Sequence, residues 1–284
     1  MIQSLKLYEG RGFDPYYNLA VEEYLLQTVE RGSCILYLWQ NQNTVVIGRN
    51  QNPWRECRTS LLEHEGGRVA LRLSGGGAVD HDLCNLNFTF LVPTEDYDLE
   101  KQLSVICLAC RSFGIEAVRS GRNDILADGR KFSGNAFYQS GGRSYHHGTL
   151  LVNADMSRMS RYLNPPKAKL EAKGVDSVRS RVVNLGQLAP KLTIDSLKTQ
   201  LRRAFQAAYG LPCSVMAPEE LDREQIEELH SRNQSWTWNY GRQLPFTFCC
   251  QGQFSWGGVQ LQLQVEGGLV RHAQVYSDAM DWCI

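Results

Sequence analysis

The chain has 284 residues, 43% of them apolar and 10% aromatic, so it can bury the core of one large domain with a small one beside it. Its 30 basic and 30 acidic residues cancel, which argues against binding nucleic acid or an anionic membrane through overall charge. We expect a cytoplasmic protein, because the sequence shows no signal peptide, no apolar run of about twenty residues and no paired Cys-x-x-Cys motifs among its nine cysteines.

The first predicted elements are a helix and a hairpin. The helix starts at Asp14 and Pro15 and buries one apolar face. Residues 34–39 and 44–47 are rich in aromatic and β-branched side chains, and a polar turn over residues 40–43 separates them. We predict that these two runs pair as a β-hairpin.

The middle of the chain combines two amphipathic helices with three strands. One apolar stripe covers residues 99–113 and ends at Gly114, and a second follows Thr193 and ends at Gly210. Between the two helices the pattern alternates. The segments that we predict as strands are residues 124–127, 131–138 and 145–152.

The C-terminal part of the sequence predicts a linker and a small second domain. Residues 236–245 mix aromatic residues with Gly and Pro, as linkers do. Residues 259–265 alternate apolar side chains with glutamines, and Gly267-Gly268 turns the chain into a second strand. We predict a large domain over residues 1–240 and a small, incomplete domain over residues 246–284.

Three consecutive glycines, Gly75 to Gly77, lie between a predicted strand and the start of another. Without Cβ atoms, their backbone N–H groups can approach a phosphate or carboxylate closely, and Arg72 would add a fixed positive charge. The spacing is not that of a Walker P-loop or a Rossmann fingerprint. From the glycines alone, an anion-binding loop and a flexible turn are equally open readings.

Lys131 is the residue that we predict to be catalytic. A tight turn at residues 128–129 places Asn123 and Asp124 opposite Lys131 and Ser133, so that an amide, a carboxylate and an ammonium converge. An ammonium there would bridge an acyl carbonyl and an α-phosphate, and it would neutralise the charge that builds as a carboxylate attacks ATP. The alternative is a solvent-facing lysine in a turn.

Two further segments carry residues suited to a binding site. His146 and His147 are adjacent in a predicted strand and point to opposite faces, so joint metal ligation is disfavoured and one of them should line the pocket. Residues 167–185 are basic and include Arg181. This segment is either a lid over an anionic ligand or an exposed charged loop.

Taken together, these segments resemble the lipoate-protein ligase A family over residues 14–278. The resemblance implies an α/β (α+β) fold, similar to class II aminoacyl-tRNA synthetases and biotin ligases, with a mixed, mostly antiparallel sheet flanked by helices and a truncated small C-terminal domain. The stretches that carry it are PYYNLAVEEYLL, LYLWQNQNTVVIGRNQNPWREC, LRLSGGGAVDHDLCNLNFTF, GRKFSGNAF, HHGTLLVNADMSRMSRYLNP, KGVDSVRSRVVNL and SWTWNYG.

The resemblance also implies a reaction. In this family lipoate and Mg-ATP form lipoyl-AMP, and the lipoyl group is then passed to one lysine of an acceptor protein. The acceptors are apo lipoyl domains of 2-oxoacid dehydrogenase E2 subunits and the glycine-cleavage H protein. The expected substrate is thus lipoate, with ATP and Mg²⁺ as cofactors.

By motif position, the resemblance assigns Lys131 to both the nucleotide phosphate and the lipoate carbonyl, and it leaves Asp124 as a candidate ligand for the Mg²⁺ that arrives with ATP. The residues expected to contact ATP or the adenylate are Arg72, Gly75, Gly76, Gly77, Ala78, Val79, Asp80, Asn85, Asn123, Asp124, Lys131 and Arg181. Those expected to contact lipoate are Trp39, Arg72, Ser74, His81, Lys131, Ser133, Gly134, His147 and Gly148.

Departures from the family pattern keep alternatives open. Asp80 stands where the family commonly has an aromatic residue, Cys84 stands where it commonly has glycine, and longer members continue past residue 278. The alternatives are a transferase that uses preformed lipoyl-AMP, an enzyme that needs a separate accessory chain, and a non-catalytic lipoyl or lipoyl-domain binding protein. An octanoyltransferase acting through a Cys thioester is disfavoured, because no Cys lies between Cys110 and Cys213.

Overall fold

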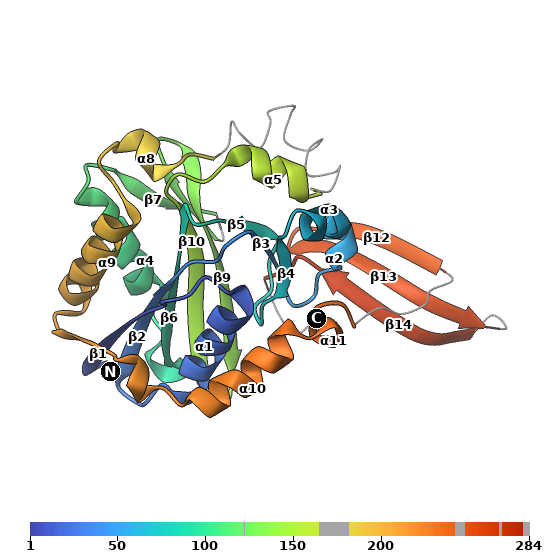
Figure 1. Cartoon of the computed structure of the whole chain (residues 1–284), viewed down its shortest axis with the longest axis horizontal. Coiled ribbons are helices and arrows are strands. Elements are labelled where there is room, and N and C mark those ends of the chain that lie inside the picture. The colour runs from blue at the N-terminus through green and yellow to red at the C-terminus, as the bar shows by residue number, and fades with distance from the viewer. Residues whose placement is uncertain (122, 165–181, 242–247, 267–268, 281–284) are drawn as a thin grey trace.

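The computed structural model describes residues 1–284 except 122, 165–181, 242–247, 267–268 and 281–284. Within the described residues, an eight-stranded sheet forms the centre of the large domain (Figure 1). In spatial order its strands are β11 (Cys213–Val215), β1 (Ser4–Glu9), β2 (Ser33–Trp39), β6 (Asn85–Pro93), β10 (Arg143–Leu151), β9 (Arg130–Ser140), β8 (Asp124–Ala127) and β7 (Ala117–Ser120). β1 runs parallel to β11 and β2, and the other neighbours pair antiparallel, as the expected fold class requires.

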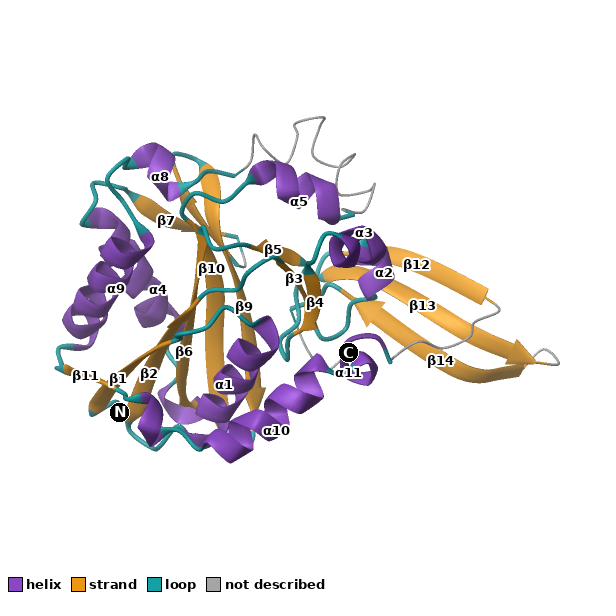
Figure 2. Ribbon diagram, in the orientation of Figure 1, coloured by secondary structure: helices purple, strands orange, loops and turns teal. Residues whose placement is uncertain are grey.

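Helices cover both faces of this sheet (Figure 2). The four long ones are α1 (Pro15–Thr28), α4 (Leu99–Arg111), α9 (Ile194–Tyr209) and α10 (Arg223–Gln234). The alternation of side chains along β2 shows how the layers form: Leu36 and Leu38 pack in the core beneath α4 and α9, whereas Tyr37 and Trp39 pack in the core beneath α1 and α10.

The predicted long helices are confirmed, and their ends follow local chemistry. Asp14 accepts hydrogen bonds from the first amides of α1, and Thr193 forms a capping box with Ser196 at the start of α9. Gly114 and Gly210 adopt the left-handed backbone that ends α4 and α9. The three predicted strands in the middle of the chain are confirmed as β8, β9 and β10.

A second, three-stranded sheet contradicts the predicted hairpin of residues 34–39 and 44–47. It contains β4 (Arg68–Leu71), β3 (Thr44–Ile47) and β5 (Val79–His81), in that order. β2 pairs with β1 and β6 of the large sheet, while β3 pairs with β4 and β5. Both runs are fully buried and find partners from distant parts of the chain, so the turn between them links two sheets.

Short helices surround this second sheet. They are α2 (Pro53–Glu56), α3 (Thr59–His64), α5 (Met156–Tyr162) and α11 (Trp236–Tyr240); α8 (Leu185–Leu188) and the 3₁₀ turns η1 (Thr94–Asp96) and η2 (Pro218–Glu220) lie elsewhere. The linker predicted over residues 236–245 is wrong for its first part, because α11 packs Trp238 and Tyr240 against the core of this sheet. No helix in the described part of the chain has the length and apolarity needed to cross a membrane.

The C-terminal residues form a third, antiparallel sheet of β12 (Phe248–Phe254), β13 (Gly257–Glu266) and β14 (Leu269–Ser277). The predicted pairing of the last two strands is confirmed, whereas β12 was not predicted because its run FCCQGQF lacks strict alternation. After β14 the chain returns to the large domain. The Ser277 amide donates to the Asn50 carbonyl at 2.6 Å, and the Gly76 amide donates to the Ala279 carbonyl at 3.0 Å.

Candidate active site

Two adjoining cavities lie where β5, β9 and β10 come together. The smaller cavity has a volume of about 150 Å³, and its walls include Trp39, His81 and His147. The larger cavity has a volume of about 510 Å³, and its walls include Met159 and Leu163 at α5. The residues that line both are Ala78, Val79, Lys131, Gly134 and Thr149.

Lys131 lies between the two cavities, and its side chain is 35% exposed. Its Nζ is 2.6 Å from Oδ1 of Asp124. A Cβ atom built at Gly134 would lie only 3.0 Å from this Nζ, so the lysine side chain lies across the bare backbone of Gly134. A side chain at position 134 would therefore crowd the ammonium of Lys131.

The β8–β9 hairpin positions Lys131 through a tight turn. Asp128 and Gly129 have φ values of 52° and 69°, as a type I′ turn requires. The predicted register is wrong, because Asp124 lies opposite Gly134 and a bulge at Phe132 of β9 shifts the strands. The Asp124 carboxylate and the Lys131 ammonium still form an ion pair, although the two residues are not directly opposite each other in the hairpin.

The glycine loop, residues Gly75 to Gly77, is shaped by close contacts with other backbone segments. A Cβ at Gly75 would lie 2.4 Å from the Ala279 carbonyl oxygen, and one at Gly48 would lie 2.3 Å from the Gly76 carbonyl oxygen. Gly76 has a φ of +92° and donates its amide to Ala279, so that amide is not available to an anion. Gly77 differs, because it lines the smaller cavity and a Cβ there would have no atom within 4 Å.

Arg72 is buried, and its guanidinium holds the glycine loop from within. Nη2 donates to the carbonyls of Gly75 and Gly77 at 2.7 and 2.8 Å, Nε donates to Ser74 Oγ at 3.0 Å, and Nη1 donates to the Val46 carbonyl at 3.3 Å. Burial lowers the pKa of Arg72 to about 10, so the group remains charged at neutral pH. Most of its donors are used by the protein, which makes it an organiser of the loop as well as part of the cavity wall.

His147 belongs to a buried chain of hydrogen bonds along the smaller cavity. Its Nδ1 lies 2.8 Å from Glu22 Oε1 and its Nε2 lies 2.9 Å from Ser74 Oγ. The same carboxylate oxygen accepts from Thr89 Oγ1 at 2.6 Å, and Thr89 accepts from the Trp39 indole N–H at 3.1 Å. Glu22 is only 2% exposed, so one carboxylate fixes the orientation of both His147 and Trp39.

His81 also lines the smaller cavity, and its side chain is uncharged. Its Nδ1 accepts from the Asn41 amide at 3.1 Å, and its Nε2 lies 3.0 Å from Thr149 Oγ1, which donates to Asn87 Oδ1 at 2.9 Å. Burial, and then the charge of Arg72, lower the pKa of His81 to about 3. His81 is therefore uncharged at physiological pH.

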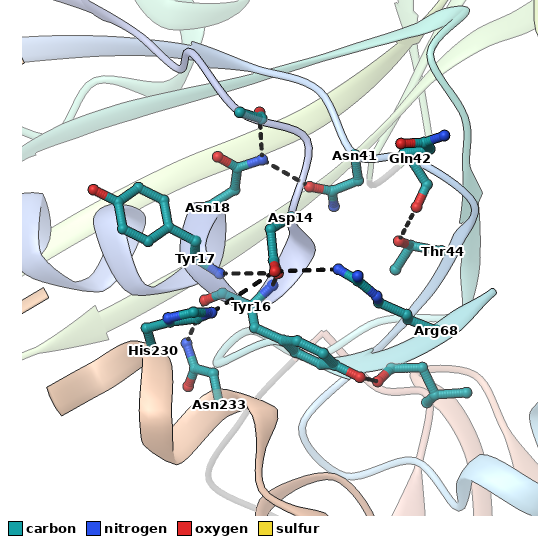
Figure 3. A network of polar contacts seen from close by, with 12 residues as sticks. Asp14, Tyr16, Tyr17, Asn18, Asn41, Gln42, Thr44, Arg68, His230 and Asn233 are labelled. Carbon is teal, nitrogen blue, oxygen red and sulfur yellow. Dashed lines mark hydrogen bonds and ion pairs between the residues drawn. The ribbon is translucent and has the colours of Figure 1, made fainter. Parts of the chain in front are cut away.

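The orientation of Asn41 is set from helix α1. The Asn18 amide group donates to Asn41 Oδ1 at 3.0 Å (Figure 3) and to the Gln40 carbonyl at 2.8 Å, so the Asn41 amide nitrogen is left to face His81. Nearby, Asp14 forms an ion pair with Arg68 at 3.1 Å. These contacts fix the start of α1 against β4, the strand that leads into the glycine loop.

Ser133 and Arg58 give the larger cavity its polar character together with Lys131. Ser133 lines this cavity, and its Oγ is buried without a hydrogen-bond partner among the described residues. Arg58 was not singled out from the sequence, yet it adds a guanidinium to the same wall. Two cations and an unpaired hydroxyl are suited to a ligand that carries phosphate and hydroxyl oxygens.

Asp80 and Asn85 lie outside the linings of both cavities. The Asp80 side chain is 2% exposed and points toward Arg158 of α5, with Oδ2 3.5 Å from Nε. Asn85 donates its side-chain amide to the Asp80 carbonyl at 3.0 Å. Both residues therefore hold strand β5 in place, and only the neighbours Val79 and His81 face the cavities.

We expect Asp80 to destabilise the fold at neutral pH. Burial raises the pKa of Asp80 from 3.8 to about 6, against the opposing effect of Arg158. Its stabilising contribution is complete below about pH 4 and is lost as the pH rises through about 6, because the folded chain then holds a buried charge. As the pH rises from about 4 to above 6, the free energy of unfolding of Asp80→Asn should therefore increase relative to that of the wild type by on the order of 2–3 kcal/mol. Urea unfolding of both proteins at two pH values measures this gain, and a pH-independent difference would contradict it.

Comparison with known proteins identifies the family. The model described as the lipoyl protein ligase A/B catalytic domain matches residues 14–206, and the model of the bacterial lipoate protein ligase C-terminus matches residues 243–283. The chain belongs to the lipoyl protein ligase A/B family. It is therefore an enzyme of the lipoate-protein ligase class.

Solved structures of this family share the fold along most of their length. LipL1 of P. falciparum, in complex with lipoate, is 28% identical with a TM-score of 0.84, and the match covers 98% of this chain and 85% of LipL1. The bipartite ligase of Thermoplasma acidophilum is 26% identical with a TM-score of 0.73, over 87% and 100% of the two chains. A lipoate-protein ligase A bound with ATP is 25% identical with a TM-score of 0.72, over 85% and 99%.

The remaining predicted residues of this lipoate-protein ligase divide into three groups. Asn123 and Gly148 line the smaller cavity, and Gly148 is needed because a Cβ there would lie 2.7 Å from the ring of Phe88. Asp124 is paired with Lys131, and the described residues contain no group of three His, Cys, Asp or Glu side chains that could hold a metal ion. Arg181 and most of the predicted basic lid lie outside the described residues.

Proposed function

We propose that the protein activates lipoate with Mg-ATP to form lipoyl-AMP, and that it then transfers the lipoyl group to a lysine of an acceptor protein. The observation that carries this proposal is that Lys131 lines both cavities. An acyl-adenylate has an acyl half and a nucleotide half that meet at an acyl phosphate. A cation at the junction of two cavities is suited to that meeting point.

The two cavities differ in ways that suit the two halves. The smaller cavity, of about 150 Å³, has the uncharged His81 ring in its wall, as suits an apolar acyl chain, and we assign lipoate to it. The larger cavity is lined by Arg58, Lys131 and Ser133, and we assign ATP to it. The complexes of LipL1 with lipoate and of lipoate-protein ligase A with ATP support lipoate and ATP as the two ligands.

In the first step a carboxylate oxygen of lipoate attacks the α-phosphorus of ATP. An oxygen–phosphorus bond forms to give lipoyl-AMP, the bond between the α-phosphorus and the oxygen that bridges to the β-phosphate breaks, and pyrophosphate leaves. Lys131 stabilises the negative charge that builds on the α-phosphate oxygens. In the second step the acceptor amine attacks the lipoyl carbonyl, the carbonyl–oxygen bond breaks, AMP leaves, and the nitrogen loses a proton.

The acceptor needs no covalent partner on this enzyme, because the mixed anhydride is already activated toward an amine. No cysteine lies in the described lining of either cavity, so a thioester route has no nucleophile there.

We propose apo lipoyl domains of E2 subunits and the H protein as acceptors, with an accessory chain as a further partner. The archaeal ligase that was studied with its E2 lipoyl domain supports this class of acceptor. We assign substrate binding to residues 1–240.

The experiment that tests this function uses an apo lipoyl domain as acceptor and follows its mass. One reaction contains lipoate and Mg-ATP, and the other contains synthetic lipoyl-AMP alone. Modification in both reactions is the expected result. Modification only with lipoyl-AMP would restrict the protein to transfer, and no modification in either reaction would contradict the proposal.

Glu22 gives a specific prediction for lipoate binding. Glu22→Ala removes the acceptor shared by His147 and Thr89, which leaves two buried donors unpaired. We expect the KM for lipoate to rise at least about tenfold, with a smaller change in the KM for ATP. Glu22→Gln is the matched control, because its amide oxygen can still accept both hydrogen bonds. Equal KM values for lipoate in Glu22→Ala and the wild type would contradict a role of Glu22 in lipoate binding.

A further inference from the structure

Helix α5 forms one wall of the larger cavity. Met159 and Ser160 line the cavity from the helix, and Leu163 and Asn164 continue the wall just beyond it. In Figure 1 α5 lies across the end of the second sheet, close to β5. The position of this seven-residue helix therefore sets the shape of the space that we assign to the nucleotide.

The two ends of α5 are attached by ordinary contacts. At the start, Asp155 caps the helix through the Ser157 amide at 2.8 Å, and its own amide donates to Asp82 at 3.3 Å. At the end, the Arg58 amide donates to the Tyr162 carbonyl at 2.8 Å. At this end the Tyr162 ring is also buried in the core of the second sheet, and its hydroxyl donates to Glu65.

The middle of α5 is attached through an ion pair with a buried carboxylate. Nε of Arg158 is 3.5 Å from Oδ2 of Asp80, Nη2 of Arg158 donates to Asn43 Oδ1 at 2.5 Å, and the guanidinium lies over the Tyr162 ring. Asp80 Oδ1 is buried and has no hydrogen-bond partner among the described residues. Removing the Asp80 carboxylate from water costs free energy, which is also why burial raises its pKa. An ion pair with such a carboxylate and one unpaired oxygen therefore contributes little to the stability of the fold.

Strand β5 connects this ion pair to both cavities. Val79, immediately before Asp80, lines both of them, and His81, immediately after it, lines the smaller one. Because side chains alternate along a strand, the Asp80 carboxylate points away from the cavities and toward α5. The ion pair thus joins the strand between the cavities to the helix that closes the larger one.

We propose that the Asp80–Arg158 ion pair is a positioning device that holds α5 at the angle needed to bind the nucleotide. This inference rests on the proposed function, since it takes the larger cavity to be the nucleotide site. Neither residue lines a cavity in the described structure, so both act through α5 and β5. Their loss should weaken binding of ATP more than binding of lipoate.

The test measures the KM values for ATP and lipoate during lipoyl-AMP formation, followed as pyrophosphate release. The variants are Asp80→Asn and Arg158→Gln, alone and together. We expect each single variant to raise the KM for ATP about tenfold and to leave the KM for lipoate within twofold. The double variant should be no worse than the more affected single one, because both changes break the same contact.

Arg161→Gln is the matched control on the same helix. Arg161 is 55% exposed and pairs with Glu65 at the surface, where an ion pair contributes little. We expect both KM values of this variant to stay within twofold of the wild type. Arg158→Lys is the milder variant if Arg158→Gln does not fold, and we expect it to raise the KM for ATP by a smaller factor.

Three results would overturn the inference. The first is a KM for ATP within twofold of the wild-type value in all folded variants at positions 80 and 158. The second is an equal rise in both KM values, which would show a general loss of structure. The third is an equal effect of Arg161→Gln. If the wild type itself makes no lipoyl-AMP, the ATP-dependent part of the proposed function fails. The KM for synthetic lipoyl-AMP in the transfer reaction is then measured in place of the KM for ATP, and the same three results would overturn the inference.

Discussion

Replacing Lys131 by alanine is expected to slow both lipoyl-AMP formation and transfer by about 10²–10³-fold. Both steps build negative charge at the acyl phosphate, and Lys131 is the cation that lines both cavities among the described residues. Its ion pair with Asp124 is more than one-third exposed on both sides, so its loss should leave the fold intact. Single-turnover rates with lipoate plus Mg-ATP, and separately with lipoyl-AMP, measure the two effects.

Lys6→Ala is the matched control for this prediction. Lys6 also lies in a strand of the central sheet, its side chain is 30% exposed, and it pairs with Glu30 at 3.4 Å. We expect its loss to leave both rates unchanged, because it is far in the sheet from β9. Near-normal rates in Lys131→Ala would refute the role that we give to Lys131.

The second large effect is expected at the glycine loop. In Gly75→Ala the new methyl group would lie 2.4 Å from the Ala279 carbonyl oxygen, and backbone must move to admit it. Arg72 donates to the Gly75 carbonyl at 2.7 Å, so this movement also displaces the guanidinium beside the smaller cavity. We expect kcat/KM for lipoate to fall about 10²-fold, as displacements of about 1 Å in a site commonly cause.

Two further variants test the same contact. Gly48→Ala would place its methyl group 2.3 Å from the Gly76 carbonyl oxygen, on the other side of the loop, and should cause a similar loss. Gly12→Ala is the steric control, since no atom lies within 4 Å of its Cβ position. Retention of more than about a third of the wild-type kcat/KM by Gly75→Ala would show that this close approach does not matter to the site.

Local signals predicted the elements whose information lies within their own residues. Helix α9 is one such element, with its cap at Thr193 and its terminating glycine at Gly210, and the 128–129 turn of the β8–β9 hairpin is another. The hairpin of residues 34–39 and 44–47 failed because the partners of both strands come from distant segments. Strand propensity identifies a strand but does not specify which sheet it joins.

The site was predictable where a residue type has few other uses, and less so where the contacts are long-range. Lys131 lines both cavities and His147 lines the smaller one, while the binding and catalytic roles assigned to them stay predictions. Glu22 was missed because it lies among the buried residues of an apolar helix, although a carboxylate on such a face was a usable signal. The use of Arg72 to hold its own loop, and the approach of Ala279, depend on contacts that no local pattern encodes.

The most direct measurement of the central claim is a crystal structure with a stable lipoyl-adenylate analogue, in which a sulfamate replaces the phosphate. We predict the lipoyl chain in the smaller cavity, the adenosine in the larger cavity beside Ser133, and Lys131 Nζ within hydrogen-bond distance of both the acyl carbonyl and the sulfamate. An analogue bound with its acyl–sulfamate junction away from Lys131, or with the adenosine outside the larger cavity, would contradict the proposed function.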